Sequence, residues 1–170
     1  MFFPCLENLK KGKFPKQSIE MFDWWLGTRR QNTLNSLNPL QFSLDCEIDV
    51  QHSLKLFSHC VFDTEIELLR RNYTVFCPNC SHKVLKSESG VNERELLCNN
   101  CGTKISSKLL TDYTELTFEL LKAPQPMELN YPDIPPPGVS GGKAQSLRVS
   151  HMDKYVDEND DDTRRLFDCL

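Results

Sequence analysis

The sequence predicts an α+β protein in which a helical half is followed by a small cysteine-rich β-ribbon and an acidic tail. Three observations lead to this prediction. Apolar residues recur at helical spacing in the first part of the chain, two Cys-x2-Cys pairs lie in the middle, and proline, glycine and acidic residues dominate the end. We therefore expect four segments, at residues 1–13, 14–75, 76–122 and 123–170.

The overall composition limits the functions open to the chain. Its 170 residues, 39% of them hydrophobic, suffice for modest cores and not for a large enzyme. The net charge of −4 gives no general attraction to nucleic acid or anionic lipid. A secretory signal needs basic residues ahead of a long apolar run, and the start of this sequence lacks that order. No apolar stretch is long enough to span a membrane. We therefore expect a cytoplasmic protein, in which clustered cysteines bind metal more often than one another.

The first predicted helix starts at Ser18, a suitable N-cap, and ends at Gly27. Its apolar residues at helical spacing are Ile19, Phe22, Trp25 and Leu26. Trp24 and Trp25 are neighbours and cannot both face one core, so one of them is a candidate anchor for a protein partner. The alternative is that the second tryptophan packs under the N-terminal pair Phe2–Phe3.

Two further helices and a hairpin are predicted before the cysteines. Pro39 suits the first position of a short helix, and Asp49 suits the N-cap of a longer one. The longer helix has a single apolar stripe formed by Val50, Leu54, Phe57 and Val61. Residues 66–75 predict a hairpin with a polar turn at residues 70–72. This order of elements is that of a small winged helix-turn-helix, which we expect over residues 14–75.

Four cysteines have the spacing of a structural zinc site: Cys77, Cys80, Cys98 and Cys101. Zinc prefers four ligands in a tetrahedron, and each Cys-x2-Cys turn can direct two thiolates at one ion. A complete shell of protein ligands leaves no position for a reacting water, so the predicted single Zn2+ is structural. Two disulfides and a redox pair fit the context less well, whereas iron could use the same four thiolates.

The ribbon around this site needs strands on each side of the cysteine turns. Val84 and Leu85 predict an outgoing strand, and Leu96 and Leu97 predict the return. Ile105 then closes the ribbon. A last strand is predicted from the alternation of Leu116, Phe118 and Leu120 with polar residues. Such a small ribbon has little core, so metal binding would supply much of its folding free energy.

The segment from residue 123 to 170 predicts a flexible tail, because its prolines, glycines and excess acidic charge cannot form a core. An acidic block at residues 157–162 precedes a short apolar cluster that includes Leu166 and Phe167. The segment is either a solvated spacer or a peptide that docks on a partner, with Leu166 and Phe167 as its anchors.

Five short motifs together resemble a known type of bacterial domain: Asn38-Pro39-Leu40, the run from Leu54 to His59, Cys77-Pro78-Asn79-Cys80, Cys98-Asn99-Asn100-Cys101 and Glu115-Leu116-Thr117-Phe118. The domain resembled is a winged-helix-like piece with a zinc ribbon, of unknown function, found upstream of class III nucleotide-cyclase and related signalling domains. The resemblance covers residues 14–124 and implies an accessory or sensory role, with the four cysteines as its only transferable residues. Because an acidic tail follows in place of a catalytic domain, it implies a detached adaptor, such as a subunit of an anti-phage defence system.

These patterns predict a non-enzymatic adaptor that joins larger protein subunits. No catalytic motif or phosphate-binding loop is present in the sequence. The alternative is a DNA-binding transcription regulator, whose candidate contacts are Lys55, Arg70 and Arg71. The acidic residues on both sides of the candidate recognition helix count against it. We expect no membrane and no small-molecule substrate, and DNA contact only weakly or inside a complex.

Overall fold

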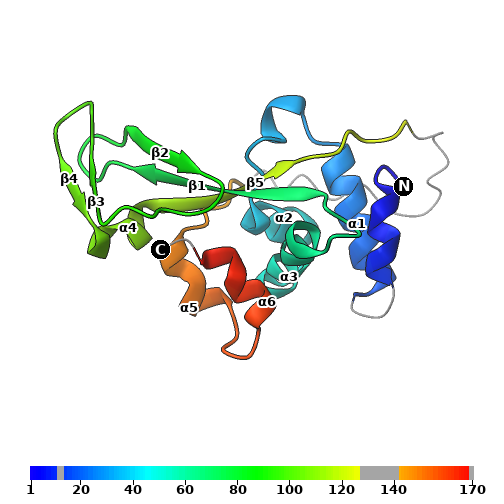
Figure 1. Cartoon of the computed structure of the whole chain (residues 1–170). Coiled ribbons are helices and arrows are strands. Elements are labelled where there is room, and N and C mark those ends of the chain that lie inside the picture. Colours follow the sequence, from blue (N-terminus) through cyan, green and yellow to red (C-terminus); the bar gives the residue numbers. More distant parts are fainter. Residues whose placement is uncertain (11–13, 127–141, 169–170) are drawn as a thin grey trace.

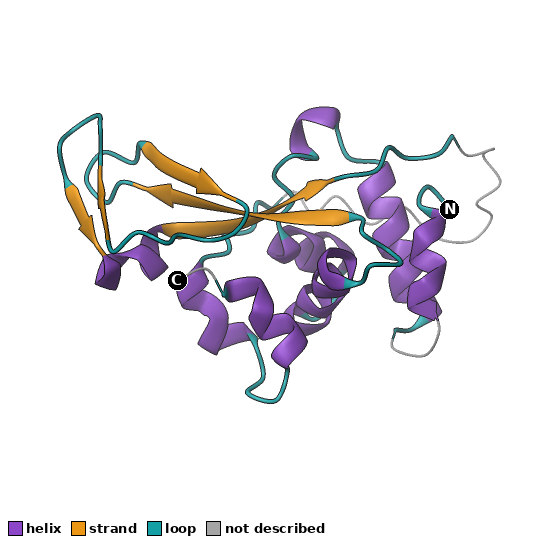
Figure 2. Cartoon of the chain, in the orientation of Figure 1, coloured by secondary structure: helices purple, strands orange, loops and turns teal. Residues whose placement is uncertain are grey.

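The computed structural model describes residues 1–10, 14–126 and 142–168. The chain is an α+β protein, with a helical half first, strands next and short helices last (Figure 1, Figure 2). The helices before the strands are η1 (Pro4–Lys10), α1 (Lys16–Gly27), η2 (Gln31–Thr33), α2 (Pro39–Cys46) and α3 (Val50–Phe62). The next elements are β1 (Leu69–Phe76), β2 (Lys83–Ser87), β3 (Glu95–Leu97), β4 (Lys104–Ser106), α4 (Ser107–Tyr113) and β5 (Thr114–Leu120). The last elements are η3 (Val149–His151), α5 (Met152–Tyr155), α6 (Asp161–Arg164) and η4 (Arg165–Phe167).

The three predicted helices are confirmed, with one shifted boundary. Helix α1 begins at Lys16, two residues before Ser18, and has no side-chain cap. In α2, Pro39 takes the first position and the Asn38 side chain accepts a hydrogen bond from the Leu40 amide. In α3, Asp49 caps the helix by accepting from the His52 amide at 3.1 Å. Local capping chemistry therefore fixes where α2 and α3 begin.

The main core is an aromatic cluster between the helices and the sheet. Phe22 contacts Phe42 and Phe57 with ring centroids 5.0 and 5.2 Å apart. From β5, Phe118 contacts Phe57 at 5.0 Å. All four rings are buried, as is Trp25 beside them. This packing holds one face of the sheet against the helical half.

The N-terminal segment is tied to α1. The Asp23 carboxylate accepts hydrogen bonds from the backbone amides of Phe2 and Phe3, at 2.8 and 2.7 Å. The Phe2 ring lies so close to Gly27 that a Cβ there would come within 2.2 Å of it. Gly27 therefore has a packing role in addition to ending the helix.

Strand β1 is the centre of a three-stranded antiparallel sheet in the order β2-β1-β5. It continues through Arg70, Arg71 and Asn72, which pair in register with β5, so the predicted turn at residues 70–72 is wrong. Arg70 has an acidic partner on each side of β1: Glu88, which directly follows β2, and Glu119 of β5. The hairpin expected of a wing is thus replaced by one strand, and the structure does not confirm a winged helix.

The expectation of a flexible tail is wrong for residues 142–168, which pack on the body of the protein. The Leu116 amide donates to the Leu147 carbonyl at 2.8 Å, and the Ser58 hydroxyl donates to the Asp162 carbonyl at 2.7 Å. Leu147 and Leu166 are buried in the main core. Figure 1 shows this orange and red segment beside α3 and under the sheet. The proline-rich part at residues 127–141 lies outside the described residues.

Among the helices of residues 1–10, 14–126 and 142–168, none combines the length and apolar character that crossing a bilayer requires.

Candidate metal centre

The four cysteines lie on two turns that share one backbone design. In the first, the Cys77 amide donates to the His82 carbonyl and the Ser81 amide donates to the Cys77 carbonyl, both at 2.9 Å. In the second, the Cys98 amide donates to the Thr103 carbonyl at 2.9 Å and the Gly102 amide donates to the Cys98 carbonyl at 2.8 Å. The fourth residue after each first cysteine has a positive φ, 57° at Ser81 and 72° at Gly102. The turns are therefore two copies of the same knuckle.

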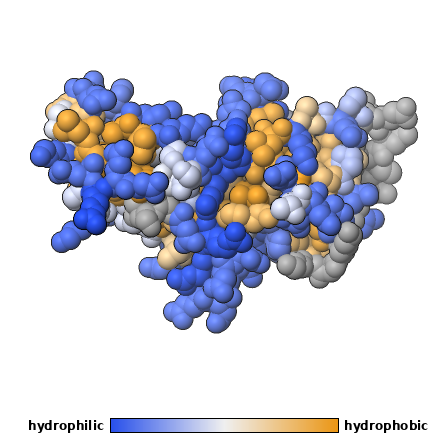
Figure 3. All heavy atoms as spheres, in the orientation of Figure 1, coloured by the Kyte–Doolittle hydropathy of each residue, from blue (hydrophilic) through white to orange (hydrophobic). Residues whose placement is uncertain are grey.

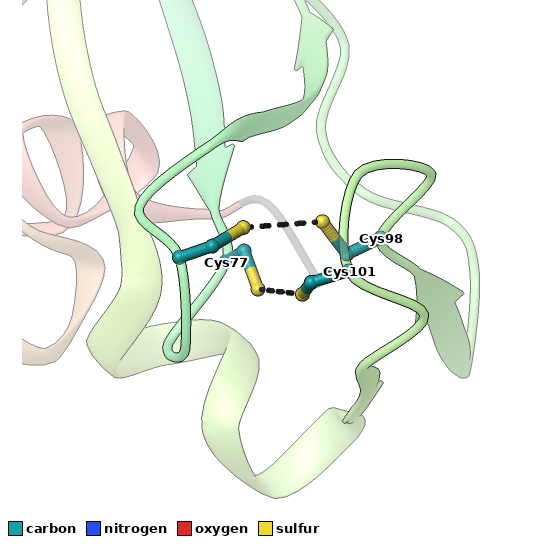
Figure 4. Close-up of side chains that lie close together, drawn as sticks. Cys77, Cys98 and Cys101 are labelled. Atoms are coloured by element: carbon teal, nitrogen blue, oxygen red, sulfur yellow. Dashed lines mark hydrogen bonds between the residues drawn. The ribbon is translucent and has the colours of Figure 1, made fainter.

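The two knuckles face each other and bring four sulfur atoms together (Figure 4). All four ligand atoms lie within 4.8 Å of one another. The Sγ atoms of Cys77 and Cys101 are 3.5 Å apart, and those of Cys80 and Cys98 are 3.6 Å apart. These separations far exceed the ~2.05 Å of a disulfide. They are close to the ~3.8 Å between sulfurs of a tetrahedral thiolate site with ~2.3 Å bonds. The donor set therefore fits one metal ion.

Two polar side chains support the sulfurs. The Thr103 hydroxyl lies 3.1 Å from Cys101 Sγ, and the Asn100 amide donates to Cys80 Sγ at 3.5 Å. Hydrogen bonds from the Thr103 hydroxyl and backbone amide lower the pKa of Cys101 to about 6. A thiolate at neutral pH is the form that binds a metal ion. Sequence reasoning missed Thr103, although a hydroxyl two residues after the last cysteine is a usable signal.

The ribbon strands pair differently from the prediction. The strand that contains Val84 and Leu85 pairs with β1, and the strand that contains Leu96 and Leu97 pairs with β4. The predicted pairing of these two strands with each other is wrong because each knuckle is itself the turn of a hairpin, β1-β2 or β3-β4. The predicted strand at residues 116–120 is confirmed as part of β5, with Leu116 and Phe118 buried against the core.

The ribbon has a small hydrophobic core of its own. Its buried members are Val75, Val91, Leu96, Ile105 and Leu110. This cluster is separate from the aromatic core of the helical half. Five aliphatic side chains provide little burial for two hairpins, so the cysteine cluster is the main link between the knuckles.

Three of the four candidate partner anchors are inside the molecule. Trp25 is buried, and its indole Nε1 donates to Asp45 at 2.9 Å. Leu166 and Phe167 are buried in the main core. Trp24 is half-buried, with its ring 5.8 Å from that of Phe2, as the alternative for this pair anticipated. These contacts make Trp25, Leu166 and Phe167 core residues, which corrects their assignment as surface anchors.

The three candidate nucleic-acid contacts are engaged within the chain. Lys55 forms an ion pair with Asp160 at 3.5 Å. Arg70 pairs with acidic residues of neighbouring segments. The Arg71 guanidinium packs over Phe62 and donates to the Arg165 carbonyl. They come from two elements, α3 and β1, and their charges are directed at the protein's own groups.

Comparison of the chain with protein-family models, with curated proteins and with solved structures finds no match.

Proposed function

We propose that the chain is a non-enzymatic adaptor of a bacterial multi-protein complex, which uses a zinc-stabilised ribbon to bind a larger protein subunit in the cytoplasm. Zinc is the proposed ion because four thiolates in a closed tetrahedral shell are its usual structural site. The same closed shell offers no position for a reacting water, which supports a structural role. The single observation that carries the adaptor proposal is the difference between the two edges of the main sheet.

One edge of that sheet is covered by the chain itself. The amides of β5 that point outward donate to carbonyls of other segments: Leu116 to Leu147 at 2.8 Å, Phe118 to Leu37 at 2.9 Å and Leu120 to Leu34 at 2.9 Å. A covered edge cannot accept a strand from another protein. A strand from another protein can therefore add to this sheet only at its opposite edge.

The opposite edge, β2, has no strand beside it among the described residues. The neighbouring hairpin β3-β4 forms a sheet of only two strands. On β3, Leu97 is 54% exposed, and on α4, which follows β4, Leu109 is 40% exposed. Figure 3 shows hydrophobic surface over this end of the molecule. An open strand edge with apolar side chains nearby is a typical site for a partner's extended segment.

The charge distribution supports a protein partner over DNA. A DNA-binding surface needs arginine and lysine side chains free to reach phosphates. Lys55, Arg70 and Arg71 are instead held by contacts within the chain. DNA contact then arises only through the partner.

The test is co-purification of the tagged full-length chain from its native host, with two matched leucine variants. Leu97→Asp changes the proposed ribbon surface. Leu44→Asp is the control, because Leu44 is also an exposed leucine, 41% accessible, but lies on α2. We expect a stoichiometric partner with the wild type and the Leu44 variant, and at least tenfold less with the Leu97 variant. Equal recovery with both variants, or tight salt-sensitive binding of the isolated chain to duplex DNA, contradicts the proposal.

A further inference from the structure

A cleft of about 390 Å3 lies between the helical half and strand β5, and its lining residues include no cysteine. Its walls come from three parts of the chain: the end of α1 through the start of α2, the strand β5, and residues 143–147. This volume is within the range of small-molecule sites in proteins.

Hydrogen bonds between distant residues hold the walls of the cleft. The Gln41 side chain accepts from the Ala144 amide at 2.9 Å and donates to the Gly142 carbonyl at 3.2 Å. The Asn38 amide group donates to the Gln145 carbonyl at 2.8 Å. These contacts fix residues 142–145 against the start of α2, so the cleft has walls held together by hydrogen bonds.

The lining of the cleft includes a cation stacked on an aromatic ring. The Arg29 guanidinium lies 4.1 Å from the centre of the Trp25 ring and also pairs with the Asp45 carboxylate. One guanidinium nitrogen of Arg29 donates to Asp45. An arginine side chain has five N–H donors in all, so others remain for a ligand. Arg29 is held in place while keeping donors for a ligand, and its side chain is 27% exposed.

Two opposite charges line the rest of the cleft. Lys143 and Glu115 both border it, and neither has an ion-pair partner among the residues that the structure describes. Since the charge of Arg29 is largely balanced by Asp45, the groups left to interact are one ammonium and one carboxylate. A ligand that carries both charges complements them better than a simple anion or cation.

We propose that this cleft binds a small zwitterion of the amino-acid class. Its carboxylate interacts with Arg29 and Lys143, its ammonium group interacts with Glu115, and the Trp25 edge contacts its apolar part. This site goes beyond the adaptor function and does not depend on it. It also departs from the sequence-based expectation that small molecules have no role, since the cleft is assembled from segments far apart in the chain.

Isothermal titration of the full chain with each of the twenty common amino acids tests the proposal. Each amino acid is compared with its analogue lacking the amino group and its analogue lacking the carboxylate. We expect at least one amino acid to bind tenfold or more tightly than both analogues. Equal binding of the deaminated analogue would identify an anion site and overturn the proposal, as would no binding of any amino acid at millimolar concentration.

Matched variants locate the binding. Lys143→Ala and Glu115→Gln should each weaken the amino acid by tenfold or more. Lys108→Ala and Glu95→Gln, which change exposed ribbon residues of the same types, should leave it unchanged. If both pairs behave alike, the ligand binds elsewhere and the assignment to this cleft fails. None of these results bears on partner binding through the ribbon, so the two proposals fail separately.

Discussion

The hydroxyl of Tyr73 donates a hydrogen bond of 2.7 Å to the carbonyl of Leu166, a residue 93 positions later in the chain. Tyr73 lies in the central strand β1, in register with Leu116 of β5 and Ser87 of β2. Both Tyr73 and Leu166 are buried. The contact joins the C-terminal segment to the middle of the sheet, which makes that segment part of the folded domain.

Tyr73→Phe should lower the free energy of unfolding by about 1–2 kcal/mol, because it removes a donor from the buried Leu166 carbonyl. Urea unfolding measures this. Tyr155→Phe is the control, since the Tyr155 hydroxyl accepts from the exposed Gln145 side chain. It should cost less than about 0.5 kcal/mol. Equal effects of the two variants would show that the buried contact is not formed.

Leu166→Ala should lower the free energy of unfolding by about 2–4 kcal/mol, because it opens a cavity in the main core. The matched control is Leu121→Ala, at a leucine that is 44% exposed, which should change stability by less than about 0.5 kcal/mol. A Leu166 variant as stable as the wild type would mean that the C-terminal segment is a solvated tail after all.

The balance between local and distant interactions explains which parts of the fold could be predicted. Asn38, Pro39 and Asp49 act within one helical turn, so the starts of α2 and α3 were readable from the sequence. The cysteine spacing was equally local. Arg70, by contrast, has the residue type of a turn, and its acidic partners Glu88, just after β2, and Glu119 of β5 are distant in the sequence. Pairing across the sheet is not encoded in any short window.

Composition gives the wrong prediction for residues 142–168 because it averages over unlike parts of the C-terminal segment. The run of prolines and glycines is confined to residues 124–142, whereas Leu147, Val149, Leu166 and Phe167 lie beyond it and are buried. Four apolar residues among many acidic ones carry little compositional weight. They suffice for packing because the rest of the main core is formed by the helices and the sheet.

Acid should selectively destabilise the network around Asp45. Burial alone would raise the pKa of this carboxyl, but hydrogen bonds from Trp25, Gln41 and Arg29, with the Arg29 charge, hold its pKa below the ordinary value. A lowered folded-state pKa gives stability that is present above the unfolded pKa, near 4, and is lost as the pH falls through the folded pKa.

Asp45→Asn should therefore lower the free energy of unfolding at pH 7 by about 1–3 kcal/mol. Urea unfolding from pH 7 to pH 3 should show this difference constant above about pH 5 and shrinking below about pH 4. Asp153→Asn, at an exposed carboxylate, is the control and should have little effect at any pH. A difference for Asp45→Asn that stays constant down to pH 3 would rule out the assigned linkage.

Thr103→Val should weaken metal binding about 10–100-fold, because it removes the hydroxyl that lies 3.1 Å from Cys101 Sγ while keeping the side-chain shape. Competition with a chromophoric zinc chelator measures the affinity. Thr64→Val, in an exposed loop outside the ribbon, provides the control. Equal zinc affinities of the two variants would show that the Thr103 hydroxyl does not support metal binding.

The most direct test of the metal centre is amide hydrogen exchange on the purified chain, with its metal content determined and a strong chelator added to half of the sample. We predict one zinc per chain. On its removal, the Cys77 and Cys98 amides, which donate to the His82 and Thr103 carbonyls, should lose protection while the Phe118 amide keeps it. A chain without zinc, or knuckle amides equally protected before and after chelation, would contradict a ribbon held together by metal.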